Sequence, residues 1–183
     1  MLGAPRPRQP ALSRNLVTSA GRWPIFAPHG SKTGKIQPVT AASLVHPDKI
    51  RAYMETDYSV AWDGSLFVLR IDRASDRLRA LYAQTGAASA LFITAFNPEG
   101  RLASDGANAE AHRRLREDLA ALRIAFAEGE GVGTDTEESW PAEKSFLALG
   151  VDKARAEELG RRYGQDAVVW ADADGVPRLL LLR

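Results

Sequence analysis

The sequence of 183 residues contains no cysteine, which excludes disulfide bonds, a thiol nucleophile and a thiolate zinc site. It also lacks an apolar run near the ~20 residues that a membrane-spanning helix needs, so we expect a cytoplasmic protein without a membrane segment. A strong net charge is missing too, because 24 Lys and Arg residues face 23 Asp and Glu residues. This balance provides no overall attraction to nucleic acid or to an anionic membrane.

Acidic side chains are absent before Asp48, while six of the cations and seven of the ten prolines lie there. With these six cations and Asp48 removed from the totals, residues 49–183 hold 18 cations and 22 acidic residues, a net charge of −4. A Pro-rich segment without a periodic apolar pattern cannot bury enough surface to offset its ordering entropy. We therefore predict a disordered or weakly ordered basic tail over residues 1–48 and one folded domain over residues 49–183.

Three interpretations of this tail stay open. In the first, the tail is upstream sequence translated from a start codon placed too early, with Met54 as the alternative start. In the second, it is a targeting peptide rich in Arg and Ser. In the third, it is a basic arm that contacts nucleic acid. The tail has no apolar core of the ~7–15 residues that secretion signals carry, which argues against export.

Two Asp-Gly pairs separate runs that have the alternation of β-strands. Asp63-Gly64 lies between 58–62 and 65–71, and Asp174-Gly175 lies between 166–172 and 176–182. Asp-Gly favours a type I′ hairpin turn, in which both central residues have positive φ. Pro177 cannot donate a ladder hydrogen bond, which predicts a strand start or a sheet edge there.

Between the hairpins the apolar period is helical, interrupted by two short apolar runs. Ser75 and Gly86 have the residue types of a helix cap and a helix stop. The predicted segments are helix 76–85, strand 90–96, helix 107–126 with Ser104 or Asp105 as cap, strand 146–149, and helix 153–163 after Asp152. This order predicts a single α/β domain: a mixed sheet with two terminal β-hairpins and about three packed helices. Right-handed crossovers would link strand 65–71 to 90–96 and strand 146–149 to 166–172.

Several short motifs together resemble a bacterial family of uncharacterised proteins, known as a domain of unknown function. They are FITAFNP (92–98), Asn108, WPAEKSF (140–146) and GQDAVVW (164–170). The likeness covers roughly residues 54–183 and leaves the tail outside. Glu99-Gly100 departs from the pattern, because a small or hydroxyl residue is expected near that position. The resemblance supports the domain limits and implies no activity.

The Gly-rich segment 129–133 does not satisfy the requirements of a phosphate loop. A dinucleotide-binding fingerprint leaves a strand and opens a helix, whereas this segment follows a predicted helix and precedes three acidic residues. We interpret it as a flexible loop with permissive backbone. Clustered oxygens at Asp135, Glu137 and Glu138 could attract Mg²⁺, but a solvated acidic loop is the simpler interpretation, and we predict no metal site and no cofactor.

The best-placed polar side chains follow strand 90–96. Asn97, Ser104 and Asn108 lie on the loop and first turn after it, where ligands of α/β sheets tend to bind. Amide and hydroxyl groups suit a neutral polar or phosphorylated ligand. The structural alternative is equally physical: Asn97 forms an Asn-Pro turn, Ser104 caps the helix, and Asn108 satisfies a loop carbonyl.

Two residues are weak catalytic candidates. His112 lies one helical turn after Asn108, but a general base needs a partner that sets its tautomer, and surface histidine is the simpler interpretation. Glu143 either faces the free amides of a helical turn begun by Pro141 or is held against Trp140 with a raised pKa.

Two further interpretations concern the C-terminal third. Gln165 is a candidate ligand contact or a turn-stabilising residue after Gly164. The clusters Arg113-Arg114-Arg116 and Arg161-Arg162 lie beside glutamates, so solvated helix faces are favoured over nucleic-acid binding.

Two functional hypotheses therefore stay open. In the first, the domain binds a small polar or nucleotide-like ligand at the strand ends near Asn97, Asn108, Trp140 and Glu143, with Ser104 and Gln165 nearby and the Gly-rich loop as a lid. It requires Asn97 and Glu143 to be close in the fold. In the second, it is a non-catalytic protein-interaction module with an exposed apolar patch or a free sheet edge near Pro177. The sequence leaves open whether the domain is an enzyme and does not predict its oligomeric state.

Overall fold

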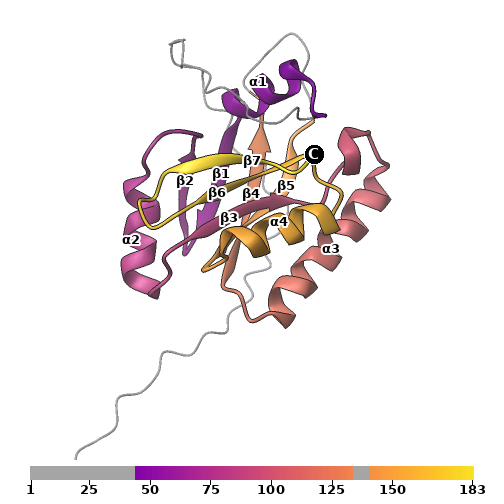
Figure 1. The fold of residues 1–183 in the computed structure, drawn as a ribbon. Helices are drawn as coiled ribbons and strands as arrows, with labels where there is room; N and C mark the ends of the chain where they lie inside the picture. The colour runs from indigo at the N-terminus through magenta and orange to yellow at the C-terminus, as the bar shows by residue number, and fades with distance from the viewer. Residues whose placement is uncertain (1–43, 134–140) are drawn as a thin grey trace, which may run out of the picture. The chain divides into compact units, whose positions relative to one another are not determined.

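The structure is a computed structural model, and it describes residues 44–133 and 141–183. Within these residues the chain forms four α-helices, seven strands and one short 3-10 turn (Figure 1). In chain order the elements are α1 (Pro47–Glu55), β1 (Asp57–Trp62), β2 (Ser65–Leu69), α2 (Asp76–Thr85), β3 (Ala90–Thr94), the 3-10 turn (Pro98–Gly100), α3 (Asp105–Ala121), β4 (Phe126–Val132), β5 (Glu143–Leu149), α4 (Lys153–Arg162), β6 (Ala167–Ala171) and β7 (Pro177–Leu181).

Helix α1 begins inside the segment that the sequence analysis assigned to the tail. Pro47 and Asp48 form its first turn, and the side chain of His46 accepts a hydrogen bond from the Asp48 amide at its start. None of its residues is fully buried, and its apolar residues Ile50 and Tyr53 are only partly buried. Residues 1–43, the rest of the predicted tail, lie outside the described residues.

The first hairpin is confirmed. Strands β1 and β2 are antiparallel, with Trp62 opposite Ser65. The two residues between them, Asp63 and Gly64, have φ of 49° and 75°, as a type I′ turn requires. In the second hairpin β6 and β7 are also antiparallel, but residues 172–176 form a loop of five residues in place of the predicted two-residue turn.

The prediction of a mixed sheet was wrong. All seven strands belong to one curled sheet in the order β2-β1-β4-β5-β3-β6-β7, and every neighbouring pair is antiparallel. Strands β2 and β3 are not neighbours, and β5 and β6 lie on either side of β3. The sequence analysis did not predict strand β4, which lies between β1 and β5 in the sheet. The strands that the predicted crossovers would have joined are therefore not neighbours.

The helices cover both faces of this sheet (Figure 1). On one face α2 buries Leu78, Leu81 and Tyr82 against Val60 and Phe92. On the other face lie α3 and α4, whose buried apolar side chains pack around the centre of the sheet; these are Leu115, Leu119, Ala156 and Leu159, with Leu91, Ile93 and Phe146 from the strands. Alternate strand residues point to opposite faces, so two apolar layers enclose the sheet.

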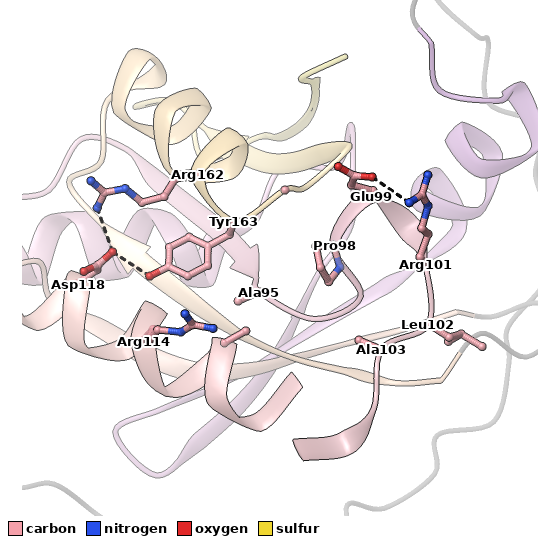
Figure 2. Close-up of a pocket in the computed structure, with 12 residues that line it drawn as sticks. Ala95, Pro98, Glu99, Arg101, Leu102, Ala103, Arg114, Asp118, Arg162 and Tyr163 are labelled. Carbon is pink, nitrogen blue, oxygen red and sulfur yellow. Dashed lines mark hydrogen bonds and ion pairs between the residues drawn. The ribbon is translucent and has the colours of Figure 1, made fainter. Parts of the chain in front are cut away.

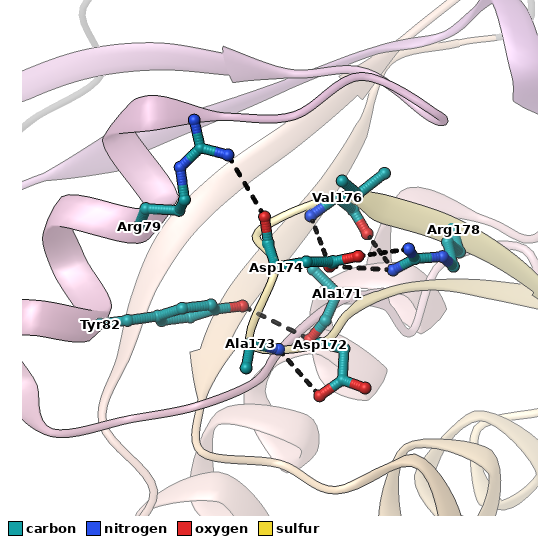
Figure 3. A network of polar contacts seen from close by, with 8 residues as sticks. All are labelled: Arg79, Tyr82, Ala171, Asp172, Ala173, Asp174, Val176 and Arg178. Atoms are coloured by element: carbon teal, nitrogen blue, oxygen red, sulfur yellow. Dashed lines mark hydrogen bonds and ion pairs between the residues drawn. The ribbon is translucent and has the colours of Figure 1, made fainter.

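The curl brings the two ends of the sheet together beside α2. The Asp72 amide, just after β2, donates to the Pro177 carbonyl at the start of β7 over 2.8 Å. Figure 3 shows the same corner, where Arg79 donates to the Asp174 carbonyl at 3.4 Å and the Tyr82 hydroxyl to the Ala171 carbonyl at 3.4 Å. Pro177 begins β7, an outer strand, as predicted from its missing N–H.

Helix α3 is shorter than predicted. It ends at Ala121, and Arg123 has a φ of 56°, a left-handed conformation that stops a helix. Phe126, predicted as its last apolar contact, instead begins strand β4. The Gly-rich segment is part of that strand: a Cβ on Gly129 would lie 2.7 Å from the Phe92 ring and 2.8 Å from the Ser59 carbonyl oxygen. Close packing, not loop flexibility, explains this glycine, and the predicted flexible loop and lid were wrong over residues 129–132.

Helices α2 and α4 begin as predicted. Ser75 accepts from the Leu78 amide and Gly86 is left-handed after α2, and Asp152 caps α4. Glu157 and Arg161, four residues apart on α4, form an ion pair at 3.1 Å. Glu158 does not pair with Arg162, which has the same spacing. It pairs with Arg155 at 2.9 Å, while Arg162 pairs with Asp118 on α3. Of the helices that the structure describes, none is long and apolar enough to cross a membrane.

Candidate functional site

Buried polar groups mark one end of the sheet. Among the described residues the buried polar or charged ones are Asn97, Asn108, Ser145 and Asp166. Asn97 follows β3, Ser145 lies near the start of β5, and Asp166 directly precedes β6. Because neighbouring strands are antiparallel, the end of β3 meets the starts of β5 and β6. A buried polar group needs a hydrogen-bond partner to offset the loss of water. We therefore expect these residues to form a hydrogen-bonded network at this end of the sheet.

The loop after β3 has an unusual backbone. Asn97 and Glu99 have φ of 48° and 60°, and Gly100 has a φ of 63°. A left-handed conformation is disfavoured for residues other than glycine, although Asn tolerates it better than most. Such positions persist where the surroundings hold them, and they cluster at functional sites.

The side chains of Asn97 and Asn108 hold this loop. The Asn97 amide N–H donates to Asn108 Oδ1 at 2.9 Å, and Asn108 Nδ2 donates to Asn97 Oδ1 at 3.0 Å. Asn97 Oδ1 also accepts from the Ala103 amide at 3.0 Å. The two side chains thereby fix both ends of the loop 97–103 to the first turns of α3.

Glu143 completes this network. Asn97 Nδ2 donates to Glu143 Oε1 at 2.8 Å, so the ligand hypothesis meets its requirement that these two residues lie close together. The predicted capping role of Glu143 was wrong, because the residue begins strand β5 and no helical turn starts at Pro141. Its carboxylate belongs to the polar end of the sheet.

Ser104 and Gln165 support the same loop from its edges. Ser104 is exposed, and its hydroxyl accepts from the Ala107 amide at 3.3 Å as the cap of α3. Gln165 Nε2 donates to the carbonyls of Phe96 and Tyr163, each at 3.1 Å. Gln165 thus joins the end of β3 to the end of α4, which agrees with its predicted turn-stabilising role.

Four candidate residues of the sequence analysis lie outside the described residues: Trp140, Asp135, Glu137 and Glu138. Within residues 44–133 and 141–183, no group of three or more His, Asp or Glu side chains could hold a metal ion.

His112 does not join the polar network. Its ring stacks on Phe146 with centroids 4.3 Å apart and an interplanar angle of 12°, and Nε2 lies 3.4 Å from Glu128 Oε2. Of the buried side-chain nitrogen and oxygen atoms in the described residues, Nδ1 is the one without a hydrogen-bond partner. The interpretation of His112 as a surface histidine was wrong, because its side chain is only 12% exposed and its ring packs between α3 and the sheet.

A second polar group lies where α1 approaches the same end of the sheet. Lys49 forms an ion pair with Asp166 Oδ2, and Arg183 reaches Asp166 Oδ1 at 2.9 Å. Burial raises the pKa of Tyr53, and the nearby carboxylates of Asp166 and Glu143 raise it further. Tyr53 therefore stays protonated at neutral pH.

An open groove with a volume of about 730 Å³ lies beside the loop 97–103 (Figure 2). One wall is the loop itself, and α3 and the end of α4 form the other side. The lining residues are Ala95, Pro98, Glu99, Arg101, Leu102, Ala103, Ala111, Arg114, Asp118, Arg162, Tyr163 and Gly164. A volume of this size falls within the ~300–1,000 Å³ of typical small-molecule sites.

The two walls of the groove are joined at Gly164. The Glu99 amide donates to the Gly164 carbonyl over 2.7 Å, and a Cβ at Gly164 would lie 3.0 Å from Pro98 Cβ. Next to it the Tyr163 hydroxyl donates to Asp118 Oδ2 at 2.8 Å. Burial, and then this hydrogen bond, raise the pKa of Tyr163, so its ring forms a fixed neutral surface.

The groove residues were not identified from the sequence as a site. Arg114 and Asp118 lie one helical turn apart on α3, which predicts a shared face. Nothing in the spacing, however, connects this face to Arg162 and Tyr163, 44 and 45 residues beyond Asp118. The side-by-side packing of α3 and α4 brings them together.

Residues 93–168 match the model of a family described as "Protein of unknown function (DUF3293)". The predicted family resemblance is confirmed. The matched span is narrower than the predicted 54–183, but it contains Asn97, Asn108, Glu143 and Gln165 together with every residue that lines the groove. Residues of α1 and Arg183 lie outside the DUF3293 match.

Other comparisons add little. The solved structure of a phage SAM lyase in complex with S-methyl-5'-thioadenosine is 13% identical, with a TM-score of 0.28, and the likeness covers 51% of this chain and 88% of that chain. At such a TM-score nothing about fold, ligand or reaction can be carried over. No curated protein matches the sequence significantly.

Proposed function

We propose that this domain binds a small polar ligand of nucleotide size in the groove beside the loop 97–103. The observation that carries the proposal is the hydrogen-bonded network of Asn97, Asn108 and Glu143, which holds a strained loop in one conformation next to that groove. A loop fixed before binding loses less entropy when a ligand arrives. A loop whose only role was to connect β3 to α3 would need neither two left-handed non-glycine residues nor buried amides.

The buried amides act as supports in this proposal. Asn97 and Asn108 use their side-chain groups on one another, on Glu143 and on Ala103. They are therefore positioning residues, and the direct contacts come from the groove lining. The polar side chains available there are Glu99, Arg101, Arg114, Asp118 and Arg162, around a largely apolar floor of Ala95, Ala111 and Pro98.

A thermal-shift experiment on the full-length protein tests this function. Nucleotides, nucleosides, sugar phosphates and amino acids are screened, because a ligand that binds the folded state raises the unfolding midpoint. Ala103→Trp places an indole in the groove, and Ala120→Trp places the same group on an exposed position of α3 that does not line it.

We expect at least one compound to raise the midpoint of the native protein and of Ala120→Trp, and to leave the midpoint of Ala103→Trp unchanged. A screen in which no compound raises the midpoint contradicts the proposal. A response that Ala103→Trp retains in full contradicts it as well, since the ligand would then lie elsewhere.

A further inference from the structure

The arginines that line the groove differ in how closely they are paired with carboxylates. Arg162 lies 3.0 Å from Asp118, and Arg101 lies 3.5 Å from Glu99. Arg114 approaches Glu110 at 3.7 Å, beyond the range of a normal hydrogen bond. Both Glu110 oxygens already accept from Arg113, at 2.7 and 3.0 Å. The Arg114 guanidinium therefore keeps its donor groups for another acceptor.

Arg114 also lies close to the aromatic surface of the groove. Figure 2 shows it below the Tyr163 ring, with Arg162 and Asp118 at the same end of the groove and Pro98 and Leu102 toward the other. One end thus offers guanidinium groups, and the middle offers the Tyr163 ring beside Ala95. Small side chains in the floor leave room for a planar ring.

We propose that the ligand of this groove is a nucleoside monophosphate, with its phosphate on Arg114 and Arg162 and its base against Tyr163. This inference rests on the proposed function and specifies its ligand class. Guanidinium groups match phosphate oxygens with two parallel hydrogen bonds, and aromatic side chains bind bases by stacking.

Two sources of negative charge lie near the proposed phosphate position, and arginine side chains offset both. The Asp118 carboxylate is occupied by Arg162 and by the Tyr163 hydroxyl. The C-terminus of α4 carries a partial negative charge, but Arg161 and Arg162 lie in its last turn and offset it. Arg114 shares the Glu110 carboxylate with Arg113 and lies too far from it for a hydrogen bond, so its guanidinium can donate to a phosphate.

Calorimetric titration of the full-length protein tests the inference. The probes are AMP, GMP, CMP and UMP, each compared with its nucleoside, and inorganic phosphate alone. Arg114→Ala is the test variant. Arg116→Ala is its matched control, because Arg116 is an exposed arginine of α3 that pairs with Glu128 and does not line the groove.

We expect at least one monophosphate to bind about tenfold or more tightly than its nucleoside, as a charged hydrogen bond implies. Arg114→Ala should remove this difference while leaving the nucleoside affinity unchanged, and Arg116→Ala should preserve it. Equal affinity for nucleoside and monophosphate, or an equal loss of both in Arg114→Ala, overturns the inference.

The two proposals fail in different ways. Suppose that no monophosphate binds, but another polar compound raises the unfolding midpoint of the native protein and not that of Ala103→Trp. The proposed ligand class is then wrong and the binding function stands. If no compound binds in either experiment, the function itself is wrong.

Discussion

The side-chain amide of Asn97 donates a 2.8 Å hydrogen bond to the Glu143 carboxylate, joining residues 46 positions apart in the sequence. This bond connects the loop after β3 to the first residue of β5. Together with the two bonds that join Asn97 and Asn108, it ties three elements into one rigid end of the sheet. The groove beside that end depends on this rigidity, and the network is open to direct tests.

Replacing Asn108 with alanine removes bonds to the backbone and side chain of Asn97 and leaves the buried amide N–H of Asn97 without a partner. We expect the free energy of unfolding to fall by about 1–3 kcal/mol, measured by urea denaturation. Glu110→Gln, at an exposed position of the same helix, should change it by less than about 0.5 kcal/mol. Equal small effects of both variants would show that the network does not hold the loop.

The left-handed backbone of Asn97 can be separated from its side-chain bonds. Asn97→Gly and Asn97→Ala both remove the amide, but only alanine must also adopt a φ of 48° with a Cβ. We expect Asn97→Ala to be less stable than Asn97→Gly by about 1 kcal/mol, the cost of a left-handed residue. Chemical denaturation of the two variants measures this difference. An alanine variant as stable as the glycine variant would mean that the loop relaxes to a negative φ.

His112 tests whether a buried histidine here has a chemical or a packing role. Its ring stacks on Phe146, and its Nδ1 lacks a partner, so His112→Phe should change stability by less than about 1 kcal/mol. His112→Ala should lose about 2–4 kcal/mol, as expected for deleting a buried ring. Thermal and urea unfolding measure both variants. If His112→Phe folds normally but no longer binds ligands that the native protein binds, the imidazole has a direct role and the packing interpretation is wrong.

The glycines of β4 provide a matched pair. A Cβ at Gly129 would meet Phe92 and the Ser59 carbonyl below 3.0 Å, whereas a Cβ at Gly131 would meet its nearest atom at 3.7 Å. We expect Gly129→Ala to lower the free energy of unfolding by about 1–3 kcal/mol. Gly131→Ala should leave it unchanged or raise it by up to about 1 kcal/mol, since glycine weakens a strand. Similar effects of the two variants would indicate that this segment is a loop after all.

Asp174 should titrate at an unusually low pH. The Arg178 guanidinium, which donates to its carboxylate at 3.0 Å, and the Val176 amide lower the pKa of Asp174 from 3.8 to about 2. Because the pKa is lower in the folded protein, the stabilisation is present above pH 3.8 and is lost as the pH falls through about 2. NMR titration of the Asp174 carboxyl carbon in Arg178→Gln should show a pKa shifted back toward 3.8. Arg155→Gln, far along the chain on α4, should leave it near 2; an unshifted value in Arg178→Gln would contradict the proposed cause.

The sequence predicted those parts of the fold that local chemistry determines. Ser75 and Asp152 cap helices, Asp63-Gly64 forms a hairpin turn, and Pro177 begins an outer strand, because each of these follows from the residue itself. Sheet order could not be predicted in the same way. Strand β4 contains two glycines, which is atypical of a strand. Gly129 is explained by its close contact with Phe92 from another strand.

The candidate site likewise combines residues that the sequence could indicate with a groove that depends on tertiary packing. The sequence identified Asn97, Asn108 and Glu143 as candidate ligand contacts, and the ligand hypothesis required Asn97 and Glu143 to lie close together, as they do. It could not identify the groove, because that depends on how α3 packs beside α4 and brings Arg114 next to Tyr163. It also missed α1, which covers the polar end with an ion pair from Lys49 and buries no residue fully.

Chemical-shift mapping by NMR tests the central claim most directly. The amide spectrum of ¹⁵N-labelled full-length protein is recorded while the tightest-binding monophosphate is added. The account predicts that the largest shifts lie in residues 98–103, 111–118 and 162–164, and that Asn108→Ala, which loosens the loop, weakens binding and broadens the signals of the first of these segments. Shifts concentrated elsewhere, for example on β1 and β2, or an unchanged spectrum at saturating ligand, would contradict it.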